Sequence, residues 1–137
     1  MSDIHAALGL GQFARWPAML ERRRHIASLY TYALGAHFAS QFQVLEKLGA
    51  MYYRLPIRVD GGLEAYEKPF SRKGITIRRG VDELLHRLRH LPDADFPNAC
   101  TAYYKTISLP IYPAMSDSEI ECAVRAASDI LMVGRGS

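Results

Sequence analysis

Two adjacent arginines, Arg78 and Arg79, are candidates for binding an anionic ligand. They end a predicted strand and precede Gly80, and a guanidinium can hold a phosphate or a carboxylate through two parallel hydrogen bonds. A surface ion pair with Asp82 or Glu83 would use the same charges, and the sequence leaves both alternatives open. We therefore treat Arg78 and Arg79 as candidate substrate-side residues.

His86 and His90 are four residues apart, which places both imidazoles on one face of a predicted helix, as in metal-binding pairs. Arg87 and Arg89 flank them, however, and no third ligand is evident from the spacing. The sequence therefore predicts no metal site. His86 is a further candidate for contact with a substrate.

A G-x-G-x-x-A pattern is formed by Gly9, Gly11 and Ala14. A dinucleotide fingerprint needs a strand that leads into the glycine turn, and only eight residues precede this one. Small residues that allow close helix packing explain the pattern better. Spacing indicates no Ser/His/Asp, Cys/His or paired-carboxylate arrangement, so we predict no catalytic residue and no cofactor-binding residue.

The composition indicates one globular domain of 137 residues, with 49% hydrophobic and 23% charged side chains. The formal charge is 17 − 14 = +3, and the basic residues are scattered. A dedicated nucleic-acid protein has a stronger basic stripe, so nucleic acid is not an expected partner. The run Arg22, Arg23 and Arg24 is typical of a solvated helix face.

Two isolated cysteines, Cys100 and Cys122, are too few for a disulfide scaffold or a zinc cluster, which fits a reducing compartment. The first residues lack the pattern of a signal peptide, and no apolar run approaches the length of a membrane span. We therefore expect a soluble, cytoplasmic protein that does not contact membranes.

The elements that would position these residues divide the chain into three parts. Residues 1–48 are predicted to form a helical arm, with a helix over 3–16 stopped or kinked at Pro17 and a second helical stretch that Gly35 interrupts. Residues 49–133 form an α+β domain, and 134–137 form a flexible tail.

Within the α+β domain, short runs of branched and aromatic residues alternate with helical patterns. Strands are predicted over 51–59, 75–78 and 106–111, and helices over 63–73, 82–90, 96–104 and 116–131. Ser116 and Glu119 form a capping box before the last helix. The fold class is α+β, in which the arm leads into a small three-stranded antiparallel sheet covered by helices.

Several stretches also match a known family in the same order along the chain. They are Met1 to Gln12, Glu21 to Arg24 with Ile26, Ala27 and Tyr30, Met51 to Val59, Arg72 to Arg79, Phe96 to Ala99, and Ser108 to Pro113 with Met115, Asp117, Glu119 and Ile120. Together they resemble the C-terminal small domain of the DegT/DnrJ/StrS family of sugar aminotransferases, which depend on pyridoxal phosphate (PLP).

The resemblance implies transfer of an amino group from an amino acid such as glutamate to a keto sugar carried on a nucleotide. It also implies that a large domain, absent from this chain, supplies the Schiff-base lysine and most cofactor contacts. The lysines present, at positions 47, 68, 73 and 105, lie in polar or element-end contexts unsuited to that role. The chain alone is therefore expected to bind no PLP and to be inactive.

The partners implied by the resemblance are the missing large domain, a nucleotide-sugar substrate and a second subunit, in a homodimer. An alternative from another class is a stand-alone dimerisation or interaction module derived from the same domain. The two differ in whether the protein, at its full length, carries PLP.

Overall fold

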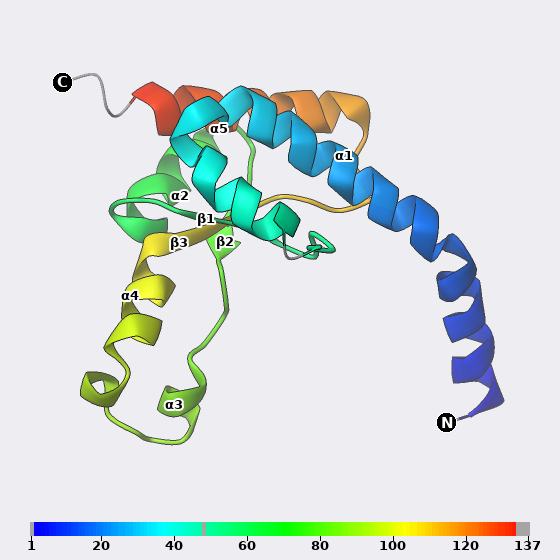
Figure 1. Cartoon of the computed structure of the whole chain (residues 1–137), viewed down its shortest axis with the longest axis horizontal. Helices are drawn as coiled ribbons and strands as arrows, with labels where there is room; N and C mark the ends of the chain where they lie inside the picture. The colour runs from blue at the N-terminus through cyan, green and yellow to red at the C-terminus, as the bar shows by residue number, and fades with distance from the viewer. Residues whose placement is uncertain (1, 48, 134–137) are drawn as a thin grey trace.

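The computed structural model describes residues 2–47 and 49–133, so the predicted tail lies outside the described residues. Two long helices, α1 (Asp3–Lys47) and α5 (Asp117–Val133), run side by side and pack over a small sheet (Figure 1). The N-terminal turns of α1 project away from this body. The division of the chain at residues 48 and 49 stays a prediction.

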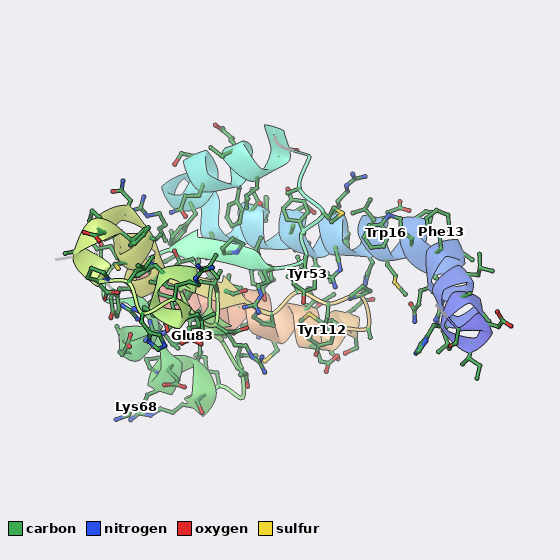
Figure 2. The ribbon with its side chains drawn as sticks, turned by 90° about the horizontal axis from the view of Figure 1, so that it is seen from below. Phe13, Trp16, Tyr53, Lys68, Glu83 and Tyr112 are labelled. Carbon is green, nitrogen blue, oxygen red and sulfur yellow. The ribbon has the colours of Figure 1, made fainter. Side chains whose placement is uncertain are left out.

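Helix α1 bends twice, and both positions carry a helix-breaking residue. Gly35 has φ 57° and ψ −154°, a positive-φ backbone that glycine adopts without steric cost, and it interrupts the helix as predicted. The chain doubles back at this break (Figure 1). Pro17, by contrast, does not end the helix. A proline inside a helix removes one hydrogen bond with the preceding turn and bends the axis there, and in Figure 2 the turns before Phe13 are tilted away from the rest of α1.

The sheet is three-stranded and antiparallel, as predicted, in the order β1-β3-β2. Its strands are β1 (Leu55–Arg58), β2 (Arg78–Arg79) and β3 (Thr106–Leu109). The register pairs Ile57 and Arg79 with Ile107 on either side of the central strand. The strands are shorter than predicted, and β2 lies at the end of the 75–78 stretch rather than along it.

Three helices and one 3-10 turn connect the strands. They are α2 (Gly62–Arg72), α3 (Leu85–Leu88), η1 (Asp93–Asp95) and α4 (Pro97–Lys105). The helices predicted over 63–73 and 96–104 are confirmed. The helix predicted over 82–90 is a single turn, because no side chain caps its start and the chain already turns at His90, which has φ 55°.

The capping box predicted for the last helix is confirmed. The Glu119 carboxylate accepts the Ser116 backbone N–H at 2.7 Å, and the Glu119 N–H donates to Ser116 Oγ at 3.3 Å. These two bonds satisfy otherwise unpaired N–H groups at the helix start. The Ser116 N–H keeps the pKa of Glu119 below its usual range.

A continuous core lies between the sheet, α1 and α5, with contributions from α2 and the loops. The hydroxyl of buried Tyr30 donates to the Pro110 carbonyl at 3.1 Å, and burial is the main cause that raises its pKa. The largest fully buried side chains are Tyr30, Phe70, Ile26, Leu34, Leu55, Ile57, Ile107, Leu109 and Ile120.

Arg22 and Arg23 attach α1 to the rest of the domain, so the expectation of a solvated arginine face is wrong for both. Arg23 Nη1 donates to the carbonyls of Tyr52, Tyr53 and Ile111 at 2.8, 3.0 and 3.0 Å. Arg22 Nη2 donates to a loop carbonyl at 2.9 Å and to Asp117 Oδ1 at 2.6 Å. We call the Arg23 contacts the carbonyl clamp.

The projecting N-terminal turns of α1, residues 3–16, carry large apolar side chains on several sides, with His5 and Gln12 as polar residues among them. From here on, the arm means these turns and not the whole of residues 1–48. At 100° per residue their large side chains are spread around the helix, and no charged residue lies between Asp3 and Arg15. Figure 2 shows Phe13 and Trp16 on this segment, beyond the body of the protein. The exposed side chains are Ile4, Leu8, Leu10, Phe13 and Trp16. In the described part of the chain, no helix is long and apolar enough to cross a membrane.

The carbonyl clamp should contribute strongly to stability. Arg23→Ala leaves the carbonyls of Tyr52 and Ile111, which are partly buried, and the exposed carbonyl of Tyr53 without this donor, and we expect the free energy of unfolding to fall by about 2 to 3 kcal/mol. Arg24→Ala is the matched control, because the exposed Arg24 side chain makes no hydrogen bond or ion pair within the described residues. Urea unfolding followed by circular dichroism measures both, and an equal effect of the two variants would contradict the clamp.

Candidate functional site

The structure places Arg78 and Arg79 on β2, at one edge of the sheet, where they point to opposite faces because side chains alternate along a strand. Arg78 pairs with Ser108, and Pro56 lies beyond it on the same face. The Arg78 side chain is exposed and makes no hydrogen bond or ion pair within the described residues. Its guanidinium is therefore available to a ligand.

The Arg79 side chain is already bound by residues of this chain. It forms an ion pair with Glu64 on α2, and its guanidinium carbon lies 4.7 Å from the ring centre of Tyr103 and 5.8 Å from that of Tyr104. Its side chain is only 17% exposed, and Nη1 is buried without a hydrogen-bond acceptor. The faces of the tyrosine rings provide the electrostatic contact that stabilises it.

The acidic partners expected for these arginines are not the ones found. Among the described residues, neither Asp82 nor Glu83 pairs with Arg78 or Arg79, and Asp82 instead binds Arg54 at 3.1 Å. The partner of Arg79, Glu64, has its pKa held below the usual range, first by its own backbone N–H and second by the Arg79 side chain.

His86 is buried, with 6% of its surface exposed, and its ring stacks on Phe96 with the ring centres 4.5 Å apart. Its Nε2 lies 2.9 Å from Asp93 Oδ1 and 3.7 Å from the sulfur of Cys100. Because both neighbours meet the same ring nitrogen, the three residues do not form a relay in which a carboxylate orients a histidine toward a thiol.

Asp93 is also bound by Arg87, through Nε at 2.9 Å to Oδ1 and Nη2 at 2.7 Å to Oδ2. This forked pair is the main cause that holds the pKa of Asp93 far below its usual range, and the His86 bond adds to it. The bonds from Arg87 to Asp93, and after them the bond to the Tyr104 hydroxyl, raise the pKa of Arg87. His90 takes no part in these contacts, because the helix ends before it.

Arg79 and Arg87 meet on one aromatic pair, Tyr103 and Tyr104 of α4. The Arg87 guanidinium carbon lies 5.2 and 5.4 Å from the two ring centres, and the tyrosine rings are edge to face at 5.3 Å. No local sequence pattern pairs these tyrosines with Arg79 or Arg87. Arg79 and Arg87, both distant in sequence from the two tyrosines, therefore hold the α3–α4 segment against the sheet. Of the two candidate arginines Arg78 and Arg79, only Arg78 has a guanidinium without a partner among the described residues.

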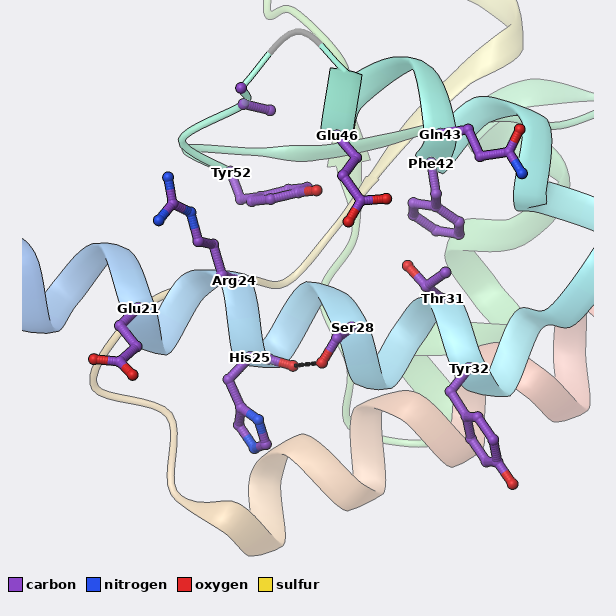
Figure 3. Close-up of a pocket in the computed structure, with 12 residues that line it drawn as sticks. Glu21, Arg24, His25, Ser28, Thr31, Tyr32, Phe42, Gln43, Glu46 and Tyr52 are labelled. Atoms are coloured by element: carbon purple, nitrogen blue, oxygen red, sulfur yellow. Dashed lines mark hydrogen bonds between the residues drawn. The ribbon is translucent and has the colours of Figure 1, made fainter.

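An open groove of about 910 Å³ lies between the two parts of α1 and the loop that follows them. In Figure 3, Tyr52 projects from the loop, with Arg24 and Glu46 on either side of its ring. Burial, followed by the charge of Glu46, raises the pKa of Tyr52. The lining mixes charges and hydroxyls without a nucleophile beside a base.

The motif formed by Gly9 and Gly11 lies inside α1, with no described strand before it, and open space surrounds both glycines. It therefore lacks the strand-to-helix turn that a dinucleotide site requires. Lys68, Lys73 and Lys105 are exposed, and Lys73 binds Asp129 at 2.7 Å. These residues do not fit a Schiff-base lysine, which needs an enclosed pocket that lowers its pKa.

Comparison with known proteins gives a consistent result over nearly the whole chain. The sequence profile of the DegT/DnrJ/EryC1/StrS aminotransferase family matches residues 1–127. The spore coat polysaccharide biosynthesis protein SpsC of Bacillus subtilis is 29% identical over 96% of this chain, which covers 37% of that relative.

Two solved structures share the fold. The putative sugar aminotransferase Spr1654 from Streptococcus pneumoniae, in its PMP form, matches 97% of this chain with a TM-score of 0.73 at 21% identity, over 36% of its own length. An aminotransferase from Psychrobacter cryohalolentis matches 97% with a TM-score of 0.79 at 16% identity, over 39% of its length. The chain spans little more than a third of these relatives, and it belongs to the DegT/DnrJ/EryC1/StrS aminotransferase family.

Proposed function

We propose that this chain is the C-terminal part of a PLP-dependent enzyme that transfers an amino group from an amino acid, such as glutamate, to a keto sugar carried on a nucleotide. The observation that carries the proposal is the match of residues 1–127 to the DegT/DnrJ/EryC1/StrS aminotransferase family, while the chain covers 37% of the relative SpsC. The relative in Bacillus subtilis is named for polysaccharide biosynthesis, which agrees with a sugar substrate.

The chain by itself is proposed to be inactive. PLP chemistry requires a lysine that forms a Schiff base and an acidic partner for the ring nitrogen. Lys68, Lys73 and Lys105 are exposed and do not fit that role, so we assign no reaction step to them. In this proposal the cofactor is bound by the large domain, which the remaining length of the relatives would supply.

Arg78 is the residue through which this part of the enzyme would contact an anionic group of the substrate. It is exposed on the sheet face that carries Ser108, and no described residue neutralises it. Arg79 and His86 remain candidates, but each would first have to give up existing contacts, with Glu64 and with Asp93 respectively. A nucleotide sugar supplies the phosphates that a guanidinium binds well.

The arm is proposed to be covered by other protein in the assembled enzyme, by the large domain and a second subunit. Large apolar side chains that are spread around an exposed helix favour its enclosure by other protein, and Phe13 is 76% exposed here. The same feature favours the alternative function, a dimerisation module, because two copies of this chain could cover their arms mutually.

The first prediction from this proposal concerns PLP. Incubation of the chain with PLP, followed by borohydride reduction and mass spectrometry, should show no stoichiometric adduct on any lysine, because the described lysines lie in solvent. A longer protein that contains the family's remaining length should show PLP absorbance. Stoichiometric labelling of a single lysine in the 137-residue chain would contradict the assignment.

The second prediction concerns association through the arm. The chain should form a dimer in light-scattering measurements, and Phe13→Glu should shift it toward the monomer, because a charge replaces an apolar contact. Tyr32→Ser is the matched control, since Tyr32 is 90% exposed on α1 outside the arm. A monomer at high concentration, or equal effects of the two variants, would rule out the arm as the interface.

The third prediction concerns Arg78 in the longer enzyme. Arg78→Ala should weaken the nucleotide-sugar substrate by about 1 to 3 kcal/mol, seen in KM, while PLP binding and stability are unchanged. Arg79→Ala should instead lower stability, because its ion pair and ring contacts are lost. Arg125→Ala, a change to an exposed residue of α5, is the control. Unchanged kinetics for Arg78→Ala would remove Arg78 from the site.

A further inference from the structure

Three side chains of different chemistry meet at the end of the domain farthest from α1 and α5. His86 comes from α3, Asp93 from η1 and Cys100 from α4, and one ligand atom of each lies within 4.8 Å of the other two. Figure 1 shows these elements as a loop that extends below the sheet. The cluster joins an imidazole nitrogen, a carboxylate oxygen and a thiol sulfur in one place.

We propose that His86, Asp93 and Cys100 form a binding site for a thiophilic divalent metal ion, with zinc as the best fit. Zinc is borderline soft and is bound by cysteine sulfur, histidine nitrogen and carboxylate oxygen. Magnesium and calcium prefer sites made of oxygen alone, which this cluster is not. The spacing of His86 and His90 suggested a metal pair in the sequence, but the fold gives His86 other partners.

Two of the three distances between the ligand atoms are close to those of a tetrahedral ion, and the third, from the Asp93 carboxylate to Cys100 Sγ, is within 4.8 Å. Bonds of about 2.0 to 2.3 Å place neighbouring ligand atoms about 3.3 to 3.6 Å apart. Cys100 Sγ and His86 Nε2 are already 3.7 Å apart. Asp93 Oδ1 and His86 Nε2 are 2.9 Å apart, a hydrogen-bond distance, and would move apart by about half an ångström once an ion replaces the proton between them.

The surroundings of the cluster favour an ordered but accessible site. Stacking on Phe96 with an interplanar angle of 12° fixes the plane of the buried His86 ring. The Asp93 side chain is 48% exposed, so an ion can enter from that side and keep a water molecule as its fourth ligand. A metal ion would thus tie together three elements that are otherwise joined by hydrogen bonds.

The positive charge of Arg87 disfavours a metal ion at this cluster, which gives the proposal a specific test. Its guanidinium bonds to both oxygens of Asp93 and neutralises the carboxylate when no ion is present. A divalent ion at the cluster is repelled by that charge and competes with it for Oδ1. Removal of the Arg87 charge should therefore strengthen metal binding, whereas loss of a ligand should weaken it.

The test is titration of the tag-free chain with cobalt(II) and zinc. Cobalt should give the near-ultraviolet charge-transfer band of a thiolate complex. Zinc should displace the cobalt ion, which removes the band, and should raise the melting temperature of the protein. Cys100→Ser should abolish the band and lower zinc affinity about tenfold or more. Cys122→Ser is the matched control, because Cys122 is an exposed thiol on α5. This variant should leave the cobalt band and the zinc affinity unchanged.

Arg87→Gln should bind zinc several-fold more tightly than the parent chain. Circular dichroism of each variant without metal shows whether the fold is retained, and His86→Gln serves as a second ligand variant if Cys100→Ser unfolds. A parent chain without the charge-transfer band, a band that persists in Cys100→Ser, or weaker zinc binding by Arg87→Gln would overturn the proposal.

Discussion

The carbonyl clamp of Arg23 is the interaction on which the arrangement of this protein depends. Three carbonyl oxygens, two from the loop before β1 and one from the loop after β3, converge on one guanidinium. Such a convergence is unfavourable without a cation, because parallel dipoles repel and partly buried acceptors need donors. The clamp therefore joins α1 to both loops at once and fixes the direction in which the arm leaves the domain.

The same use of arginine recurs at the other end of the sheet. Arg79 and Arg87 each combine a carboxylate partner with the faces of Tyr103 and Tyr104, and so hold the α3–α4 segment near β2. A planar guanidinium suits this work because it donates in its plane and stacks above it. Of the arginines first considered for a ligand, Arg78 is the one that remains free within the described residues.

Charge is distributed unevenly along the molecule, and this bears on assembly. The domain body carries charged pairs over its surface, whereas the arm has none between Asp3 and Arg15. An apolar helix that leaves the domain at a fixed angle is suited to insertion into a second protein surface. The family relatives are nearly three times as long as the stretch this chain matches, which is consistent with the proposal that such a surface belongs to the rest of the enzyme.

The sequence determined the features that depend on neighbouring residues. Gly35 breaks α1 and the Ser116 capping box starts α5 because each acts on backbone groups within a few positions. The family and the three-stranded fold were also recognisable from the sequence. Only the tertiary structure decided which charged residues pair. Arg22 and Asp117 are 95 positions apart, and Arg79 pairs with Glu64 rather than with Asp82, which is closer in the sequence. Such ion pairs, and the cluster of His86, Asp93 and Cys100, form where segments that are separate in the sequence come together. The packing of the core brings those segments together, and no local sequence pattern encodes that packing.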